Sequence, residues 1–210
     1  WSLTWEAQAL LRARPVAGDV ALGADFMALA DRIRYPETFG EAEIREVRRI
    51  KARVEAERLP RGVDPKRHLK LGPGGLSDVE WLLQLLQLGY GAHHPALRTP
   101  STLEALSGAV AAGLLGQAES EQLRAAWVLA SRIRSAAKLW SGRVGDSLPT
   151  DRVELEGIAG VLGMPPGRTT ELEERWLGAA RRARAVFERE FYGYSDRPPT
   201  FPLILPIDAG

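Results

Sequence analysis

The chain has 210 residues, of which 45% are hydrophobic and 26% charged, with a formal net charge of +1, values near those of ordinary globular proteins. The length suffices for one or two domains with a buried core, and the balanced charge indicates no class of partner. Absent cysteines exclude disulfides, and the lack of a long apolar run or signal-peptide layout predicts a soluble, cytoplasmic protein without a membrane partner.

Helical spacing dominates the sequence and strand alternation is nearly absent, which predicts an all-α fold. The expected helices cover, in chain order, about residues 2–14, 21–34, 41–58, 77–88, 101–116, 119–140, 153–162 and 170–192. Prolines 15 and 36 end the first two, because the residue before a proline avoids helical geometry. We expect a helical bundle of about five main helices preceded by two leading helices. Residues 194–210, with four prolines, should form an extended or disordered tail.

The most specialised stretch is LKLGPGGLSDVEWLLQLLQL, residues 69–88. Gly72, Gly74 and Gly75 allow the backbone to take positive φ or to approach another surface closely, while Pro73 stiffens the loop. A lysine and a glycine-rich loop before a helix suggest a phosphate cradle, but the Walker spacing is missing. The pattern therefore favours a shaped junction.

The helix after this loop carries acids and amides at defined positions. Ser77 and Glu80 have the spacing of a capping box, and Asp78 lies in the first turn, where the positive helix end stabilises a carboxylate. We expect these structural roles to outweigh direct chemistry for both acids. With Gln84 and Gln87, Ser77 and Glu80 form a narrow polar stripe that suits a buried or interfacial hydrogen-bond network.

A basic segment, residues 45–70, holds ten lysines and arginines against four acids, an excess of six positive charges. Such a surface would attract phosphates or an acidic protein, and an ordinary solvated helix face explains it equally well. We expect His68 to add to this patch. Aromatic residues do not interleave with the basic ones, which argues against nucleic acid as a partner.

The residues themselves offer no self-contained catalytic centre. No GxSxG nucleophile elbow occurs, and no further ligands complete a metal set with the adjacent His93 and His94. We assign no catalytic and no metal-binding residue to this chain.

Five segments together resemble a known family. They are WSLTWEAQALLRARPVAGD (1–19), LKLGPGGLSDVEWLLQLLQL (69–88), RTPSTLEAL (98–106), GDSLPTD (145–151) and VFEREFYG (186–193). Over nearly all of residues 1–193, the chain resembles the C-terminal half of the bifunctional glutamine synthetase adenylyltransferase/adenylyl-removing enzymes. The related PII uridylyltransferases share a similar KxGxGG element.

The resemblance implies a transferase that moves AMP from ATP to a tyrosine of glutamine synthetase, while a second domain removes it by phosphorolysis. Glutamine synthetase and the PII signal protein would be its partners, and ATP and Mg²⁺ its cofactors in the full-length protein. The family's fold is a nucleotidyltransferase domain of the DNA polymerase β type followed by a helical bundle. Three carboxylates and a glycine-serine turn hold magnesium in such domains.

This chain departs from the family at that point, because it has no glycine-serine turn followed by an Asp-x-Asp pair. The start at Trp1 also suggests a fragment, which we expect to be inactive alone. The resemblance implies that residues 1–40 are the end of the nucleotidyltransferase domain and a connecting helix, and that residues 41–193 are the bundle. Arg12, Arg14 and Lys70 are candidates to face the nucleotide phosphates or the upstream domain, with Gly72, Gly74 and Gly75 permitting close approach. Ser77, Asp78 and Glu80 match the family's motif and should set the register of the loop.

Two other functions remain open on the sequence. The chain could be a stand-alone helical interaction module that binds through residues 45–70. It could also be a relative of the uridylyltransferases that modify PII.

Overall fold

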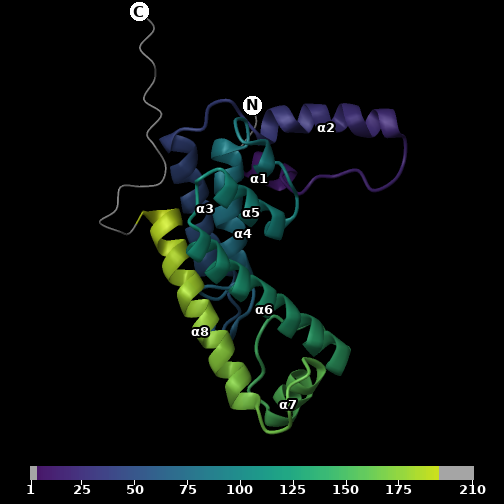
Figure 1. Ribbon diagram of the computed structural model, residues 1–210, viewed down its shortest axis with the longest axis vertical. Coiled ribbons are helices and arrows are strands. Elements are labelled where there is room, and N and C mark those ends of the chain that lie inside the picture. The colour runs from purple at the N-terminus through teal and green to yellow at the C-terminus, as the bar shows by residue number, and fades with distance from the viewer. Residues whose placement is uncertain (1–3, 194–210) are drawn as a thin grey trace, which may run out of the picture. The chain divides into compact units, whose positions relative to one another are not determined.

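The computed structural model describes residues 4–193 and is built of helices (Figure 1). Over this range the chain forms eight α-helices and no strand, and the only strand-like pairing is an isolated bridge between His68 and Ser147. The α-helices are α1 (Thr4–Leu10), α2 (Val20–Arg34), α3 (Glu41–Arg58), α4 (Leu76–Tyr90), α5 (Thr102–Ala111), α6 (Gln117–Ser141), α7 (Arg152–Val161) and α8 (Thr169–Phe187). Short helical turns are η1 (Pro65–Arg67) and η2 (Pro95–Leu97), and a π-turn, η3 (Glu188–Tyr192), continues α8. The all-α prediction is confirmed, and the predicted tail lies outside the described residues.

Most helix boundaries follow the sequence, but two predicted helix ends are wrong. The helix predicted to reach Gly116 stops at Ala111, because Gly113 takes a φ of 71° and the amides of Leu114 and Leu115 turn back to the carbonyl of Ala109. The predicted end at Arg14 is wrong, because α1 stops at Leu10. Arg34 explains the early stop: its Nη1 donates to the carbonyls of Leu10 at 2.9 Å and Ala13 at 3.0 Å. The guanidinium thus binds two carbonyls at and just after the end of α1, and the Leu10 carbonyl also accepts from the amide of Ala13 in a tightened last turn.

Contacts divide the chain into two compact units, each described here by itself. Within the described residues, the first unit takes the chain up to Lys51, Leu82–Gly116 and the residues from Glu190 onward. The second unit takes Ala52–Trp81 and Gln117–Arg189. Each unit is therefore made of segments that are separated in the sequence but in contact with one another. The division at residue 40 that the family resemblance implies stays a prediction.

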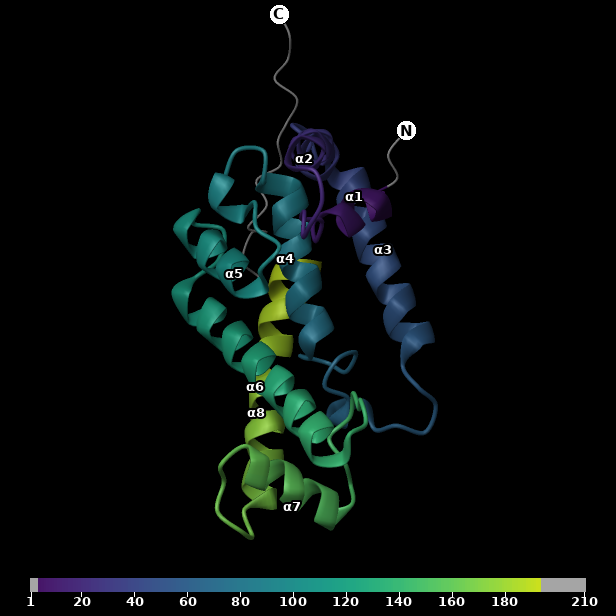
Figure 2. The ribbon, with the colours of Figure 1, turned by 90° about the vertical axis from the view of Figure 1, so that its right-hand side faces the viewer.

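The second unit has its core where α6, α7 and α8 pack against one another (Figure 2). Trp176 of α8 is completely buried, and its indole Nε1 donates to the carbonyl of Lys66 at 2.9 Å. The same core cluster contains apolar side chains from all three helices, from the glycine-rich loop and from the loop between α6 and α7, among them Leu69, Ile133, Leu148 and Ile158. Burial of this kind contributes roughly 1.5–3 kcal/mol for each large side chain. The loop is therefore part of a core.

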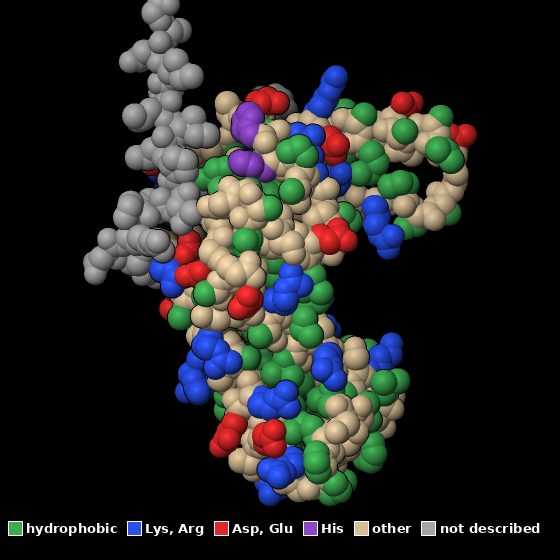
Figure 3. All heavy atoms as spheres, viewed as in Figure 1, with side chains coloured by type: hydrophobic (Ala, Val, Ile, Leu, Met, Phe, Trp, Pro, Cys, Tyr) green, Lys and Arg blue, Asp and Glu red, His purple; other side chains and the backbone are tan. Residues whose placement is uncertain are grey.

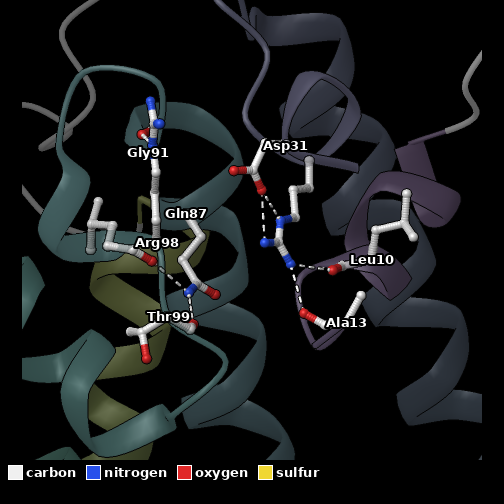
Figure 4. Close-up of polar contacts among 9 residues, drawn as sticks. Leu10, Ala13, Asp31, Gln87, Gly91, Arg98 and Thr99 are labelled. Carbon is white, nitrogen blue, oxygen red and sulfur yellow. Dashed lines mark hydrogen bonds and ion pairs between the residues drawn. The ribbon is translucent and has the colours of Figure 1, made fainter. Parts of the chain in front are cut away.

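Buried polar side chains hold the loops of the first unit (Figure 4). Arg34 also binds Asp31, with Nε 2.8 Å from Oδ1, so its guanidinium joins α2 to the end of α1. Gln87 of α4 is buried and its Nε2 donates to the carbonyls of Leu97 and Thr99 at 2.8 and 2.7 Å. These side chains thus donate hydrogen bonds to backbone carbonyls at the ends of helices and in the loops between them.

The polar stripe of α4 behaves largely as expected. Gln84 accepts from Gln8 Nε2 at 2.6 Å, and Gln87 binds the two carbonyls just described. The predicted hydrogen-bond network is confirmed for these two amides. Across residues 4–193, no helix combines the length and apolar content needed to cross a bilayer.

Candidate functional site

The glycine-rich loop between η1 and α4 directs its own amides inward. Every backbone N–H of residues 70–72 and 74–78 donates to an acceptor in the protein, and residue 73 is a proline without one. Two side chains accept some of these bonds: His68 Nδ1 accepts from Lys70 and Leu71, and the carboxylate of Asp78 accepts from Gly74. The other amides donate to backbone carbonyls, Gly72 to His68, Gly75 to Gly72, Leu76 to Leu69, Ser77 to Lys70 and Asp78 to Gly75. A phosphate cradle needs amides that point at the ligand. This loop uses them internally.

The three glycines are required by neighbouring backbone. A Cβ on Gly74 would overlap the carbonyl of Ala180 in α8, and Gly74 also has a φ of 74°. A Cβ on Gly72 would overlap the carbonyls of Pro65 and His68. The close approach expected of these glycines is thus made to the protein's own carbonyls in the second unit. Their assignment to a nucleotide stays a prediction.

The start of α4 differs from the predicted capping box. The helix begins at Leu76, so Ser77 lies inside the first turn and the prediction that it caps the helix is wrong. The reason is the loop itself, because Leu76 and Ser77 donate their amides to the carbonyls of Leu69 and Lys70. Glu80 instead accepts a hydrogen bond from Trp127 Nε1 of α6 at 3.3 Å.

Asp78 is the fully buried member of an ion-pair cluster centred on Arg184. Its side chain is 0% exposed, and Oδ2 accepts from the amide of Gly74 at 2.7 Å and lies 3.1 Å from Arg184 Nη1. The same guanidinium binds Glu55 at 2.8 Å through Nη1 and Glu188 at 2.7 Å through Nε. Asp78 therefore ties the turn at Gly74 to α8, a role broader than compensating the helix dipole.

Electrostatics keep the guanidinium of Arg184 charged. Burial opposes the positive charge of Arg184, but the carboxylate of Asp78 and hydrogen bonds with Glu188 and Glu55 outweigh it and raise the pKa of Arg184 above its ordinary value. A guanidinium held among three carboxylates has no free fork for a phosphate. Nothing in the local sequence around Arg184 indicated this role, since its partners Asp78 and Glu55 lie 106 and 129 residues away.

His68 does not contribute to a basic surface, so that prediction is wrong. Its side chain is buried, and Nδ1 accepts from the amides of Leu71 at 3.0 Å and Lys70 at 3.3 Å. Burial lowers the pKa of His68 below its ordinary value, although the carboxylate of Asp146 acts in the opposite direction. A neutral imidazole with an unprotonated Nδ1 fits both amide donors.

The basic segment of residues 45–70 is only partly a surface. Lys51 is buried, Arg48 donates to the carbonyl of Phe191, and Arg67 binds Glu173 at 2.7 Å and the carbonyl of Leu148 at 3.0 Å. The seven exposed members are Arg45, Arg49, Arg53, Arg58, Arg61, Lys66 and Lys70, of which the first two pair with acids on their own helix. The excess of positive charge that faces solvent is smaller than the sequence suggests.

The remaining candidates for phosphate contact fall in separate units. Arg12 belongs to the first unit, where Nη1 donates to the carbonyl of Pro100 at 2.8 Å and Nη2 to Thr102 Oγ1 at 3.2 Å. Arg14 of the same unit and Lys70 of the second unit are exposed. Residues 4–193 contain no group of three or more His, Cys, Asp or Glu side chains that could hold a metal ion.

Comparison with known proteins supplies the family. Residues 42–191 match the family model described as GlnD PII-uridylyltransferase. The chain belongs to this family. The match runs from the start of α3 into η3 and contains the glycine-rich loop, whereas α1 and α2 precede it.

The curated relatives of this uridylyltransferase-family chain carry a different name. It is 62% identical over 95% of its length to a bifunctional glutamine synthetase adenylyltransferase/adenylyl-removing enzyme of Leifsonia xyli subsp. xyli. Proteins of the same name from Streptomyces avermitilis and Cutibacterium acnes are 54% and 47% identical over 92% and 91% of the chain. The resemblance predicted from the sequence is confirmed. The chain spans about a fifth of the length of these relatives, 20%, 19% and 20% respectively.

One groove is present in this family member away from the glycine-rich loop. It lies in the second unit beside α7 and has a volume of about 780 Å³. Trp140 forms one wall, lying so close to Gly157 that a Cβ there would overlap the indole. The exposed hydrophobic residues Trp140, Val153 and Val161 line it. The groove is mainly apolar, with Arg152 and Glu156 as the charged residues of its lining.

Proposed function

We propose that this chain is the helical portion of a longer adenylyltransferase, which moves AMP from ATP to a tyrosine of glutamine synthetase. The observation that carries the proposal is the identity of 47% to 62% with proteins of that name over at least 91% of the chain. The chain spans about a fifth of those relatives, so activity belongs to the whole polypeptide.

In the proposed reaction, this chain supports and positions the groups that face the nucleotide or the domain that holds it. The bundle carries a rigid loop, pinned by Asp78 and Arg184, from which the exposed Lys70 projects at the loop's start. Lys70 and Arg14 supply exposed positive charge for the triphosphate or for the domain that holds it. Arg12 holds the segment before α5 in place through its hydrogen bonds to Pro100 and Thr102. ATP and Mg²⁺ are bound by the rest of the enzyme, and the proposal places the reaction in the cytoplasm.

The transfer reaction tests the proposal directly. The complete polypeptide is incubated with glutamine synthetase, Mg²⁺ and ATP labelled at the α-phosphate, and the label is followed onto the synthetase. We expect the label on glutamine synthetase with the complete polypeptide and none with the 210-residue chain alone.

The family model leaves one alternative, uridylyl transfer to PII. A parallel reaction with PII and UTP labelled at the α-phosphate distinguishes the two. Label on PII with none on glutamine synthetase would overturn the proposal. Added PII and glutamine should change the rate of AMP transfer if they regulate this enzyme, as the resemblance implies.

A further inference from the structure

Helix α2 has an apolar surface that the described chain does not cover. Leu22, Phe26 and Leu29 follow one another at helical spacing and are 69%, 50% and 58% exposed. Figure 3 shows hydrophobic side chains along the segment that Figure 1 labels α2. Single exposed hydrophobic residues are common on proteins, but three large ones on one stripe of one helix are not.

The buried residues of α2 lie at its C-terminal end, while Gly23 and Met27 in its N-terminal half are only partly buried. Ala30 and Arg34 are its only buried residues, and Arg34 binds the end of α1. The first ten residues, Val20–Leu29, contain none. A helix of this length without tertiary packing is marginal in water, since nucleation is costly and each turn adds little. Its N-terminal half therefore needs a partner.

The lengths of the relatives indicate which partner is available. Each relative is a single chain about five times as long as this one, so most of the polypeptide lies outside these residues. A domain joined covalently is present at an effective concentration of order millimolar, well above that of a separate protein. Linkage favours an occupant from the same polypeptide.

We propose that the stripe Leu22, Phe26 and Leu29 is a docking surface for an apolar face of another domain of the same polypeptide. The proposal rests on the proposed function only in placing this chain within a longer enzyme. Docking buries the stripe and holds the N-terminal half of α2 in its helical state. The readout below is hydrogen exchange and not AMP transfer, so failure of either proposal is recognised separately.

Amide hydrogen exchange of residues 20–29 in the complete polypeptide tests the docking. We expect these amides to exchange at least about 100-fold more slowly than in an unstructured peptide, because opening a packed helix requires its partner to separate. Exchange within about tenfold of the peptide rate would mean that the stripe is uncovered and would overturn the proposal.

Two matched variants assign the protection to the stripe. Phe26→Glu places a charge on it, and Ala24→Glu places the same charge at an exposed position on a different face of α2. We expect Phe26→Glu to lose at least about tenfold of the protection and Ala24→Glu to lose less than about twofold. Equal loss in both variants would contradict the proposal.

A second copy of the chain is the competing occupant. Exchange of residues 20–29 and the sedimentation coefficient are therefore measured over about a hundredfold range of protein concentration. Docking within one polypeptide leaves both unchanged. Protection that rises with concentration would assign the stripe to self-association and overturn the proposal.

Discussion

Asp78 is the residue on which the second unit depends most directly. Its carboxylate is fully buried, and two of its partners, the amide of Gly74 and the guanidinium of Arg184, come from the loop and from α8. Removing one member of a buried pair leaves the other charge without compensation, which costs more than the pair contributes. Arg184 keeps Glu55 and Glu188, which limits the penalty.

For Asp78→Asn we expect a loss of about 2–3 kcal/mol in the free energy of unfolding, because the amide removes the charge but fits the space. Glu188→Gln is the matched control, since its carboxylate binds the same guanidinium but is 44% exposed. Solvent screening should keep its cost below about 1 kcal/mol. Urea denaturation measures the free energy of unfolding of both variants. Equal losses would show that the burial of Asp78 does not determine the cost of removing its charge.

His68 gives the stability of the chain a pH dependence with a definite sign. Burial lowers its folded pKa below the ordinary value of 6.5, so the unfolded chain binds the proton more tightly. The contribution of neutral His68 is complete above about pH 6.5 and is lost as the pH falls from there toward the folded pKa.

We expect His68→Asn to reduce this pH dependence. Asparagine Oδ1 can accept from the amides of Leu71 and Lys70 in place of Nδ1, yet it does not titrate. Urea midpoints of the variant and the parent chain are compared at about pH 7.5 and about pH 5.5. A parent and variant that lose the same stability on acidification would exclude His68 as the cause.

At the scale of elements, the loop and α8 form one structural piece. Gly74 lies against the backbone of Ala180, while Asp78, four residues further on, binds Arg184, one turn along α8. Glu80 reaches Trp127 of α6 from the same first turns of α4. The loop is thus anchored to two helices of the unit by its glycines and acids together.

Gly74→Ala should be strongly destabilising for two reasons, backbone strain at positive φ and overlap of the new Cβ with α8. Gly62→Ala introduces the strain without the overlap and therefore separates the two effects. Both glycines have positive φ, 74° and 80°, but a Cβ on Gly62 meets nothing within 4 Å, whereas one on Gly74 meets Ala180. We expect about 1 kcal/mol for Gly62→Ala from backbone strain alone and at least about 3 kcal/mol for Gly74→Ala. Similar values by urea denaturation would mean that α8 moves aside at little cost.

At the scale of the whole molecule, the chain spans about a fifth of the relatives it matches, and under the proposed function it contributes surfaces to a longer enzyme. Its exposed large hydrophobic residues within the described range fall in two stretches of sequence, residues 5–29 and 139–161. The first contains the proposed docking stripe Leu22, Phe26 and Leu29, and three residues of the second line the groove beside α7. Exposed positive charge at Lys70 remains for contact with nucleotide or with another domain.

Lys70→Ala in the complete polypeptide tests that contact. If the ammonium group binds the triphosphate, kcat/KM for ATP should fall about ten- to a hundred-fold, the range expected for losing a hydrogen bond to a charged group. Lys66→Ala is the control, being an exposed lysine of the same unit outside the loop. Unchanged ATP kinetics in Lys70→Ala, or equal losses in both variants, would remove Lys70 from the site.

Local signals in the sequence were sufficient for the helices and for the family. Apolar spacing and prolines act within a few residues, so the bounds of α3 were predicted as found. Long motifs were enough to identify the relatives. The amides of Gln84 and Gln87 could also be predicted to be engaged, because their stripe lacked lysine and arginine.

Only the tertiary structure decided what the glycines, Asp78 and His68 do. The glycines are needed because carbonyls of Pro65, His68 and Ala180 lie against them, and Asp78 is buried because Arg184 arrives from α8. His68 and Ser77 were predicted wrongly for the same reason, since the loop's fold places their side chains and amides inside the unit. Residue type and spacing determine which groups can hydrogen-bond, but packing between distant segments determines which partners they meet.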